Sequence, residues 1–330
     1  MYKYEEINSI HLEVTSKCQA KCPMCPRRVN GGIINPFIDL HEITLEQFKV
    51  WFSEDFIKQL TDLFMCGNLG DPIIAQDTLE ILRYLKKVNP NISLSMHTNG
   101  SARTTAWWQE LAKTNVQVIF GIDGLADTHS LYRVSTDWNK IIENATAFIQ
   151  AGGIAEWHML VFKHNEHQID DCRQLSYELG FTDFASKHTA RFMGNKLHVL
   201  DEEGKTAHVI YPTQKSYDMI PKIQQSAVDI KPNSISCKAK NHNQIYVSAN
   251  GNVSPCCWID FQWVVPLHDA RIDYMDRINE FPNLNETTLV DIFSSQYFTK
   301  IADTWNSNPL IECSRQCGNY DQLVEQFDSN

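Results

Sequence analysis

The sequence predicts an α/β fold, a partial (β/α)6 barrel of the TIM type followed by a small cysteine-rich domain. Short apolar runs alternate with amphipathic helical segments over roughly the first 190 residues. This alternation favours a parallel sheet with helices outside it and right-handed crossovers. Six strand-helix units fall short of the eight that close a TIM barrel, so we expect an open barrel. A group of cysteines then follows residue 235.

The elements follow one another in a regular order. After a first apolar strand, a helix is expected to begin at Thr44, because Thr44 and Gln47 have capping-box spacing and Leu45, Phe48, Phe52 and Phe56 share a helical face. Glycines at 152 and 153 end a later helix that carries apolar residues at helical spacing. The expected strands are 10–15, 62–66, 92–96, 116–122, 156–162 and a weak pattern at 183–187. The expected helices are 44–56, 77–87, 104–113, 138–150 and 168–179.

Polar or glycine-containing turns follow the first four expected strands. They comprise a cysteine loop at 18–25, the turn 67–72, His97-Thr-Asn-Gly100 and Asp123-Gly124. The carboxyl ends of parallel strands share one edge of the sheet, and ligands bind at that edge in α/β folds. We therefore expect these turns to converge on one site.

The strand-helix rhythm stops near residue 194. We expect a barrel domain at 1–194, a bridging segment at 195–235 and a cysteine-rich domain at 236–330. With 43% apolar residues the 330-residue chain has enough material for a buried core. Its net charge of −11 argues against general binding to nucleic acid or to anionic membranes. There is no secretion signal and no apolar run long enough to span a membrane, so a cytoplasmic location is expected.

Eight of the ten cysteines fall into two groups with ligand-like spacings. Without a secretion signal, such groups suit metal binding better than disulfides. The first group is Cys18-x3-Cys22-x2-Cys25, directly after the first expected strand. Three thiolates leave one metal position open to a substrate or cofactor. The alternative is a structural zinc site completed by a residue such as His11.

The C-x3-C-x2-C loop after the first strand of a βα-repeat chain resembles the radical S-adenosylmethionine (SAM) superfamily. The resemblance implies that Cys18, Cys22 and Cys25 bind three irons of a [4Fe-4S] cluster, and that SAM chelates the fourth and is cleaved to a 5′-deoxyadenosyl radical. Met24 stands where the family usually has an aromatic residue near the adenine.

Other motifs extend the resemblance to SAM-binding residues. The turn containing Gly70 and Asp71 is similar to the family's glycine-rich motif for the SAM amino group, with Asp in place of the more usual Glu. Asn99, after the third strand, fits a polar contact to SAM. Gly121-Ile-Asp123-Gly124 resembles the family's Ser-x-Asp-Gly motif but lacks the serine whose hydroxyl would meet the ribose, which leaves Asp123 either a SAM-binding residue or a structural turn residue.

Three further residues complete the expected SAM site. Arg133, in Tyr-Arg, matches an arginine that reaches the SAM carboxylate in related enzymes, and a bidentate guanidinium suits that contact. The resemblance also implies contacts of Phe162 with adenine and of Asn165 with the methionine portion. The alternatives are a core position for Phe162 and a solvated helix face for Arg133.

The second cysteine group resembles the SPASM and twitch extensions of radical SAM enzymes, because Cys237-x13-Gly-x4-Cys256 is followed by Cys313-x3-Cys317. The resemblance implies a twitch-like domain with one auxiliary [4Fe-4S] cluster on Cys237, Cys256, Cys313 and Cys317. Cys257 competes with Cys256 as the ligand. A structural zinc on the same four cysteines is the alternative.

The resemblance implies an enzyme that abstracts hydrogen from a C–H bond of a peptide or protein. The alternatives are a dehydrogenase or rearrangement enzyme for a small molecule such as an aminocyclitol or sugar, and a non-enzymatic iron-sulfur or zinc redox sensor or scaffold. Candidate substrate-facing catalytic residues are His188, Arg191 and Tyr211. Expected partners are a reductant such as flavodoxin or ferredoxin and, for a precursor peptide, a separate leader-binding protein, because only nine residues precede the first strand.

Overall fold

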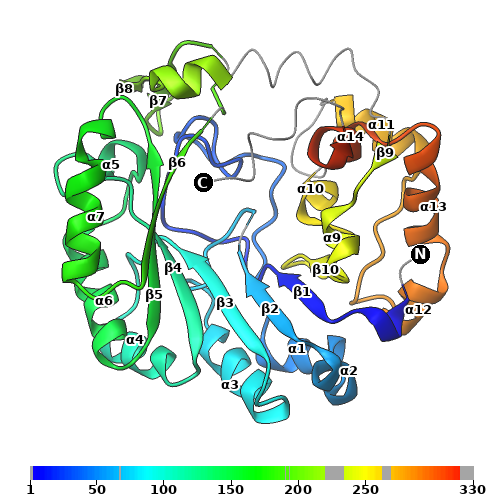
Figure 1. The fold of residues 1–330 in the computed structure, drawn as a ribbon. Helices are drawn as coiled ribbons and strands as arrows, with labels where there is room; N and C mark the ends of the chain where they lie inside the picture. The colour runs from blue at the N-terminus through cyan, green and yellow to red at the C-terminus, as the bar shows by residue number, and fades with distance from the viewer. Residues whose placement is uncertain are drawn as a thin grey trace.

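The computed structural model describes residues 3–66, 68–189, 191–192, 194–219, 234–261 and 269–319. Its main sheet has eight strands in the order β11-β10-β1-β2-β3-β4-β5-β6 (Figure 1). Strands β1 to β6 pair in parallel in chain order, which confirms the predicted partial barrel. Their bounds are β1 Ser9–Leu12, β2 Asp62–Met65, β3 Ser93–Thr98, β4 Val116–Gly121, β5 Ile154–Val161 and β6 Asp183–His188.

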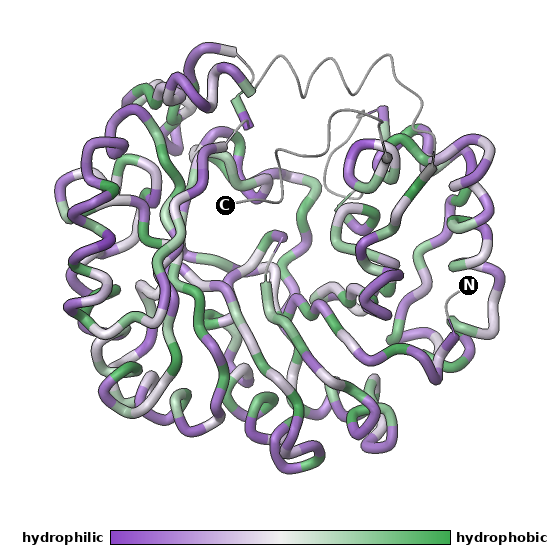
Figure 2. Tube along the Cα trace, viewed as in Figure 1, coloured by the Kyte–Doolittle hydropathy of each residue, from purple (hydrophilic) through white to green (hydrophobic). Residues whose placement is uncertain are grey.

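Helices connect these strands and cover the outer face of the sheet (Figure 1). Their bounds in this part of the chain are α1 Leu45–Trp51, α2 Glu54–Gln59, α3 Thr78–Val88, α4 Thr105–Ala112, α5 His129–Tyr132, α6 Trp138–Gln150 and α7 Ile169–Glu178. Short 3-10 turns lie at Tyr4–Glu6 and Glu166–Gln168. Hydrophobic residues recur along the central strands, and much of the hydrophilic colour lies on the surrounding helices and loops (Figure 2).

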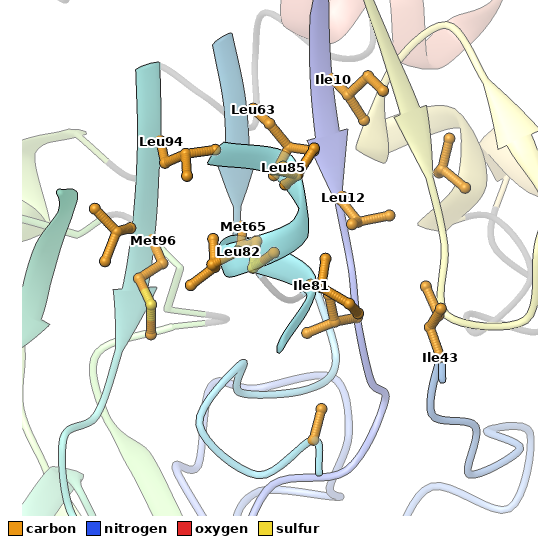
Figure 3. Close-up of a cluster of buried hydrophobic side chains, with 14 of the residues drawn as sticks. Ile10, Leu12, Ile43, Leu63, Met65, Ile81, Leu82, Leu85, Leu94 and Met96 are labelled. Carbon is orange, nitrogen blue, oxygen red and sulfur yellow. The ribbon is translucent and has the colours of Figure 1, made fainter. Parts of the chain in front are cut away.

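The hydrophobic core lies between the sheet and its helices. Alternate residues of each strand point outward, so Leu63 and Met65 of β2 meet the buried side chains Leu82 and Leu85 of α3 (Figure 3). The same alternation leaves the residues between them on the inner face, toward the barrel interior. Polar side chains in these strands are therefore concentrated on the inner face.

One expected helix is two helices in the structure. The capping box of Thr44 and Gln47 is confirmed at the start of α1. The helix ends at Trp51, and Ser53 caps α2 by accepting a hydrogen bond from the Phe56 amide (3.2 Å). The prediction of one continuous helix through Phe56 was wrong because the shared apolar face conceals a second serine N-cap.

The segment after β6 contains regular structure that the sequence did not signal. Strands β7 (Leu197–Leu200) and β8 (Thr206–Ile210) form an antiparallel hairpin. The acidic residues 201–203 form its turn, and Asp201 accepts hydrogen bonds from the Glu203 and Lys205 amides. Part of the expected bridging segment, residues 220–233, lies outside the described residues.

The C-terminal part supplies the other two strands of the main sheet. Strand β10 (Gln244–Val247) pairs in parallel with β1, opposite Ser9–Leu12, and β11 (Val253–Ser254) pairs antiparallel with β10. A smaller sheet joins β9 (Ser234–Ile235) to β12 (Gly318–Asn319). The expected division at residue 235 stays a proposal, since the main sheet crosses it.

Several short helices surround these C-terminal strands. They are α9 Lys238–Asn241, α10 Cys257–Asp260, α11 Asp269–Arg277, α12 Leu289–Ser294, α13 Tyr297–Asp303 and α14 Ile311–Cys317, with a 3-10 turn at Thr304–Asn306. Among the described residues, none of the helices has the length and apolar character that a bilayer span requires.

Candidate active site

The first cysteine group lies in the loop that leaves β1. Burial raises the pKa of the Cys22 thiol to about 11 and also raises the pKa values of Cys18 and Cys25. The Cys22 thiol adds to the rise at Cys18, and Cys25 adds to the rise at Cys22, so the sulfurs lie close enough to repel one another as thiolates. A positively charged iron centre would favour the thiolate forms. This donor set fits the expected cluster.

The cluster explains why these thiols need not meet at one point. Within the described ranges, no three His, Cys, Asp or Glu side chains are arranged around the position of a single metal ion. The thiolates of a [4Fe-4S] cluster bind different irons, so they surround a larger body than one zinc ion.

Arg27 is a buried neighbour of this loop that the sequence reasoning missed. Its side chain is 3% exposed, and Nη2 donates to the Cys18 carbonyl. Its Nε has no hydrogen-bond partner among the described residues. An arginine after the third cysteine has no spacing signal of its own, so only the fold shows that it lies inward, against the loop backbone.

The turn after β2 meets the cysteine loop through Asp71. This carboxylate is buried, and burial raises its pKa, although hydrogen bonds from the Asn99 amide (2.7 Å) and the Thr98 hydroxyl (2.8 Å) oppose the rise. The Asn99 side chain also donates to Asp71 (2.5 Å), and its Nδ2 lies 3.7 Å from the Cys18 sulfur. The structure therefore brings Asp71 and Asn99 together beside the first cysteine, as the strand-end argument predicted.

Gly70 is required by the path of this turn. A Cβ at this position would lie 1.6 Å from the Thr15 carbonyl oxygen, a distance that no side chain tolerates. The Asp71 amide then donates to the Lys17 carbonyl (3.0 Å). The turn therefore lies directly against the backbone that leads into the cysteine loop. Gly67, the first residue of the expected motif, lies outside the described residues.

Arg133 connects the β4 end to the cysteine loop. Its Nε donates to Asp123 Oδ2 (2.6 Å), and its Nη1 lies 3.9 Å from the Cys22 sulfur. The second Asp123 oxygen accepts from the Leu160 amide (2.6 Å), so this fully buried carboxylate is occupied on both sides. Asp123 thus supports Arg133. Its expected contact with SAM stays a prediction.

The missing serine of the β4 motif has a structural reason. A Cβ on Gly121 would lie 2.5 Å from Arg133 Nη2 and 3.0 Å from its Cζ. The guanidinium therefore occupies the space that a side chain at this position would fill. Glycine at 121 and arginine at 133 are a matched pair.

Phe162, Asn165 and Met24 lie on the side of the cysteine loop that faces β5. Phe162 is fully buried against Tyr132, with ring centroids 4.6 Å apart, in an apolar cluster that Met24 and Cys22 also contact. The Asn165 side chain bonds the backbone of Phe162, Asp123 and Leu160. Phe162 therefore packs against the cysteine loop, and Asn165 holds the backbone after β5 against the end of β4. Their expected contacts with SAM stay predictions.

The four thiols that the family resemblance assigns to an auxiliary cluster lie near one another. Burial raises the pKa values of Cys256 and Cys313, and Cys237 adds to the rise at both. Cys317 shares a hydrogen bond with Cys237, which raises its pKa further. The Ser236 amide donates to the Cys317 carbonyl (2.9 Å) beside the pairing of β9 and β12, which explains how residues 80 positions apart meet. These four thiols fit the expected auxiliary cluster.

The Cys257 thiol has a different environment. Burial raises its pKa to about 12, and the next contributions come from Cys66, Asp260 and Glu13, although Cys257 also raises the pKa of its chain neighbour Cys256. Cys256 is extended, whereas Cys257 begins α10, so the two side chains leave the backbone in different directions. This geometry favours Cys256 over Cys257 as the ligand.

The three candidate substrate residues have separate surroundings. Arg191 is exposed, and its charge lowers the pKa of Cys66, which burial raises. The His188 ring bonds the Thr213 hydroxyl (2.8 Å), and Tyr211 is 51% exposed. Of the three residues, Arg191 is the one whose charge affects the pKa of a buried thiol. That thiol is Cys66, which also interacts electrostatically with Glu13 and Cys257. The structure does not bring the three together.

A row of rings on the inner face was also missed from the sequence. The rings follow one another in the order His11, Phe64, His97 and His158. The distances between successive ring centroids are 5.1, 5.2 and 5.6 Å. Burial lowers the pKa values of His11 and His97 to about 4, so both are neutral at pH 7. Polar residues alternating with apolar ones in these strands were the available signal. Neutral imidazoles can hydrogen-bond a polar substrate.

Two segments of the chain match two family models. Residues 12–175 match the radical SAM superfamily, and residues 237–318 match SPASM, an iron-sulfur cluster-binding domain. A curated relative is the FeMo cofactor biosynthesis protein NifB of Methanocaldococcus infernus, 23% identical over 120 residues. That similarity covers 35% of this chain and 39% of NifB, about two fifths of the relative's length.

Solved structures share the fold across both halves. Streptococcus suis SuiB bound to S-adenosylmethionine is 14% identical with a TM-score of 0.56, covering 93% of this chain and 67% of SuiB. The structure of anSMEcpe with bound AdoMet and a Cp18Cys peptide is 15% identical with a TM-score of 0.56, covering 91% of this chain and 83% of that chain. At such low identity the likeness is one of fold.

The family matches explain the two cysteine groups described above. The first requires a [4Fe-4S] cluster and SAM, and the second requires auxiliary iron-sulfur binding. Cys18, Cys22 and Cys25 fall within the first match, and Cys237, Cys256, Cys313 and Cys317 fall within the second. The chain therefore belongs to the radical SAM superfamily and carries a SPASM iron-sulfur cluster-binding domain at its C-terminus.

Proposed function

We propose that the protein uses SAM to abstract a hydrogen atom from a C–H bond of a peptide or protein. The observation that carries this proposal is the convergence of Asp71 and Asn99 beside the Cys18 sulfur, with Arg133 beside Cys22. These groups come from three different strand ends. Together they offer an anion, an amide and a guanidinium around one position.

The chemistry of these groups suits the polar end of SAM. When bound, the cluster supplies an electron that cleaves SAM to a 5′-deoxyadenosyl radical. Asp71 accepts hydrogen bonds from the SAM ammonium, and Arg133 donates to its carboxylate, because opposite charges strengthen such contacts in a buried site. Asn99 orients Asp71 through two hydrogen bonds, and Met24, which packs against the apolar cluster that contains Cys22, would contact the adenine.

A peptide substrate is supported by the fold similarity. SuiB has been solved with its precursor peptide SuiA, and anSMEcpe with a Cp18Cys peptide. We propose that the substrate enters between the two cysteine groups, near Cys66, where the charge of Arg191 opposes the rise in thiol pKa that burial causes. Tyr211 and His188 would lie farther out. A flavodoxin or ferredoxin would deliver the electron, and a separate leader-binding protein would present a precursor peptide.

Anaerobic turnover tests the radical chemistry. The reconstituted protein, incubated with SAM and dithionite, should release 5′-deoxyadenosine and methionine. A triple variant with alanine at Cys18, Cys22 and Cys25 should retain the auxiliary iron and release none. If the wild-type protein holds intact clusters and forms no 5′-deoxyadenosine, the proposed chemistry is wrong. Deuterium transfer from labelled peptide pools into 5′-deoxyadenosine, and not from sugars or aminocyclitols, would support the peptide over the small molecule.

A further inference from the structure

Glu13 is a buried acid that the SAM site as described does not use. It follows β1 on the inner face of the sheet, is 2% exposed and lies between the glycine turn and the SPASM domain. Its Oε1 accepts hydrogen bonds from the backbone amides of Leu69 (2.7 Å) and Gly70 (2.9 Å). Its Oε2 accepts from the hydroxyl of Tyr246 (2.6 Å). One carboxylate therefore joins two parts of the molecule.

Tyr246 reaches Glu13 because of the register between β10 and β1. Tyr246 lies opposite His11 in the parallel pair, and the two rings contact with centroids 4.9 Å apart. Both side chains therefore occupy the inner face, and the hydroxyl reaches the acid two residues beyond His11. Tyr246 is fully buried, so water cannot replace its hydrogen bond without opening the sheet.

A second contact ties the same turn to the SPASM domain. The Asn68 side chain donates to the Cys257 carbonyl (3.0 Å) and lies 3.5 Å from the Tyr246 hydroxyl. Cys257 is the chain neighbour of Cys256, one of the four thiols of the auxiliary group. The turn is thus held at Asn68 and, through Glu13, at Leu69 and Gly70.

These contacts act directly before the proposed SAM-binding residue. Asp71 follows Gly70, and its amide is fixed to the Lys17 carbonyl (3.0 Å). Released from Glu13, the partly buried Leu69 and Gly70 amides would lose their acceptor, and the turn would shift to satisfy them. A shift of the turn moves the Asp71 carboxylate relative to Cys18. Small displacements of a binding group cost affinity because its hydrogen bonds depend on distance and angle.

We propose that Glu13 and Tyr246 are positioning residues through which the SPASM domain sets the geometry of the SAM-binding turn. The inference rests on the proposed function, in that Asp71 binds the SAM ammonium. In this proposal neither residue binds SAM directly. The auxiliary domain then has a role in SAM binding that is separate from any electron transfer by its cluster.

The variant Tyr246→Phe tests this role, because it deletes one hydroxyl and keeps the buried ring. The protein is reconstituted anaerobically with both clusters, and SAM affinity is measured by equilibrium dialysis with radiolabelled SAM. We expect Kd to rise about five- to tenfold, which corresponds to the loss of one buried hydrogen bond. Iron content should stay unchanged. The SAM-induced change in the electron paramagnetic resonance spectrum of the reduced first cluster should require correspondingly more SAM.

Tyr274→Phe is the matched control. Tyr274 is also a buried tyrosine of the C-terminal part, and its hydroxyl donates to the Glu280 carbonyl (2.6 Å), away from the turn. This variant should bind SAM as the wild type does. A conservative replacement gives a second control: Glu13→Gln keeps an acceptor for the two amides and a partner for Tyr246, so its Kd should stay within about twofold, whereas Glu13→Ala should match or exceed the loss at Tyr246.

The outcomes separate the inference from the function on which it rests. Wild-type protein that binds no SAM would refute the proposed function. If the wild type binds SAM and Tyr246→Phe has the same Kd, the positioning role alone is refuted. It is also refuted if Tyr274→Phe loses as much SAM affinity as Tyr246→Phe, because that would indicate a general loss of stability. If Tyr246→Phe does not fold, the ratio of Kd values for Glu13→Ala and Glu13→Gln decides: a ratio near one rejects the role.

Discussion

The pairing of Gly121 with Arg133 leads to a prediction that a likeness to related sequences would get wrong. The related motif has serine at position 121, so Gly121→Ser would be expected to add a ribose contact. The structure predicts the opposite. The new Cβ would lie 2.5 Å from Arg133 Nη2, whereas ordinary contacts lie at 3.4–4 Å. The guanidinium would have to move by about 1 Å to reach a normal contact distance.

That displacement would weaken the hydrogen bond from Arg133 Nε to Asp123 (2.6 Å) and move the guanidinium from Cys22. A hydrogen bond to a charged group contributes roughly 1.5–3 kcal/mol. If Arg133 binds the SAM carboxylate, losing its position should weaken SAM binding by a similar amount, which is about tenfold or more in Kd. Gly121→Ala should behave like Gly121→Ser, because the Cβ causes the clash.

A double-mutant cycle provides the decisive assay. Arg133→Ala removes the guanidinium, so Gly121→Ser in that background should change the SAM Kd by less than about twofold. SAM affinity is measured by equilibrium dialysis for the four proteins, each with its iron content determined. Tight SAM binding by the single variant Gly121→Ser would refute the reasoning. A penalty for serine that persists without Arg133 would also refute it, because the cost would then come from the strand itself.

Two other predictions follow from the thiol and histidine environments. Cys256→Ala should lose about four of about eight irons per chain, whereas Cys257→Ala should keep them all. Iron and sulfide analysis of the anaerobically reconstituted variants decides between these two ligands. Burial lowers the folded pKa values of His11 and His97 to about 4, so the unfolded chain binds more protons between pH 6.5 and 4. Stability should therefore be fully present above about pH 6.5 and fall as the pH drops toward 4, by at most about 3.4 kcal/mol for each ring. Chemical denaturation of the holoenzyme from pH 7.5 to 5.5 should show this slope, reduced in His97→Asn; an unchanged slope would argue against the neutral buried ring.

The barrel was predictable because its determinants are local. Alternating strand and helix patterns predict parallel pairing, and the strand-end rule then predicts that Asp71 and Asn99 meet beside Cys18, as the hydrogen bonds show. The auxiliary ligand set came from the family resemblance and stays a prediction, although the four thiols lie near one another. These inferences require only the order of elements and the kind of ligand.

The contacts that support the site were not predictable in this way. Gly121 has no room for a side chain because the guanidinium of Arg133, twelve residues later in the chain, lies beside it. This restriction depends on where that guanidinium lies. The role of Glu13 depends on Tyr246, which is 233 positions away in the chain. No local pattern encodes such pairs, because each member is an ordinary residue until the fold places it against the other. A charged residue within an apolar strand was the one available signal for Glu13.

Strand register makes the link between the two halves specific. Residues 244–247 pair with residues 9–12, so Tyr246 shares the inner face with His11, and its hydroxyl meets Glu13. A slip of one residue would turn Tyr246 to the outer face, where helices cover the sheet, and would leave Glu13 with a buried oxygen and no donor. The wrong register is therefore less stable, because it leaves the buried acid without this hydrogen bond. Because the same acid holds the turn before Asp71, correct docking of the SPASM strand and correct geometry of the proposed SAM site depend on one carboxylate.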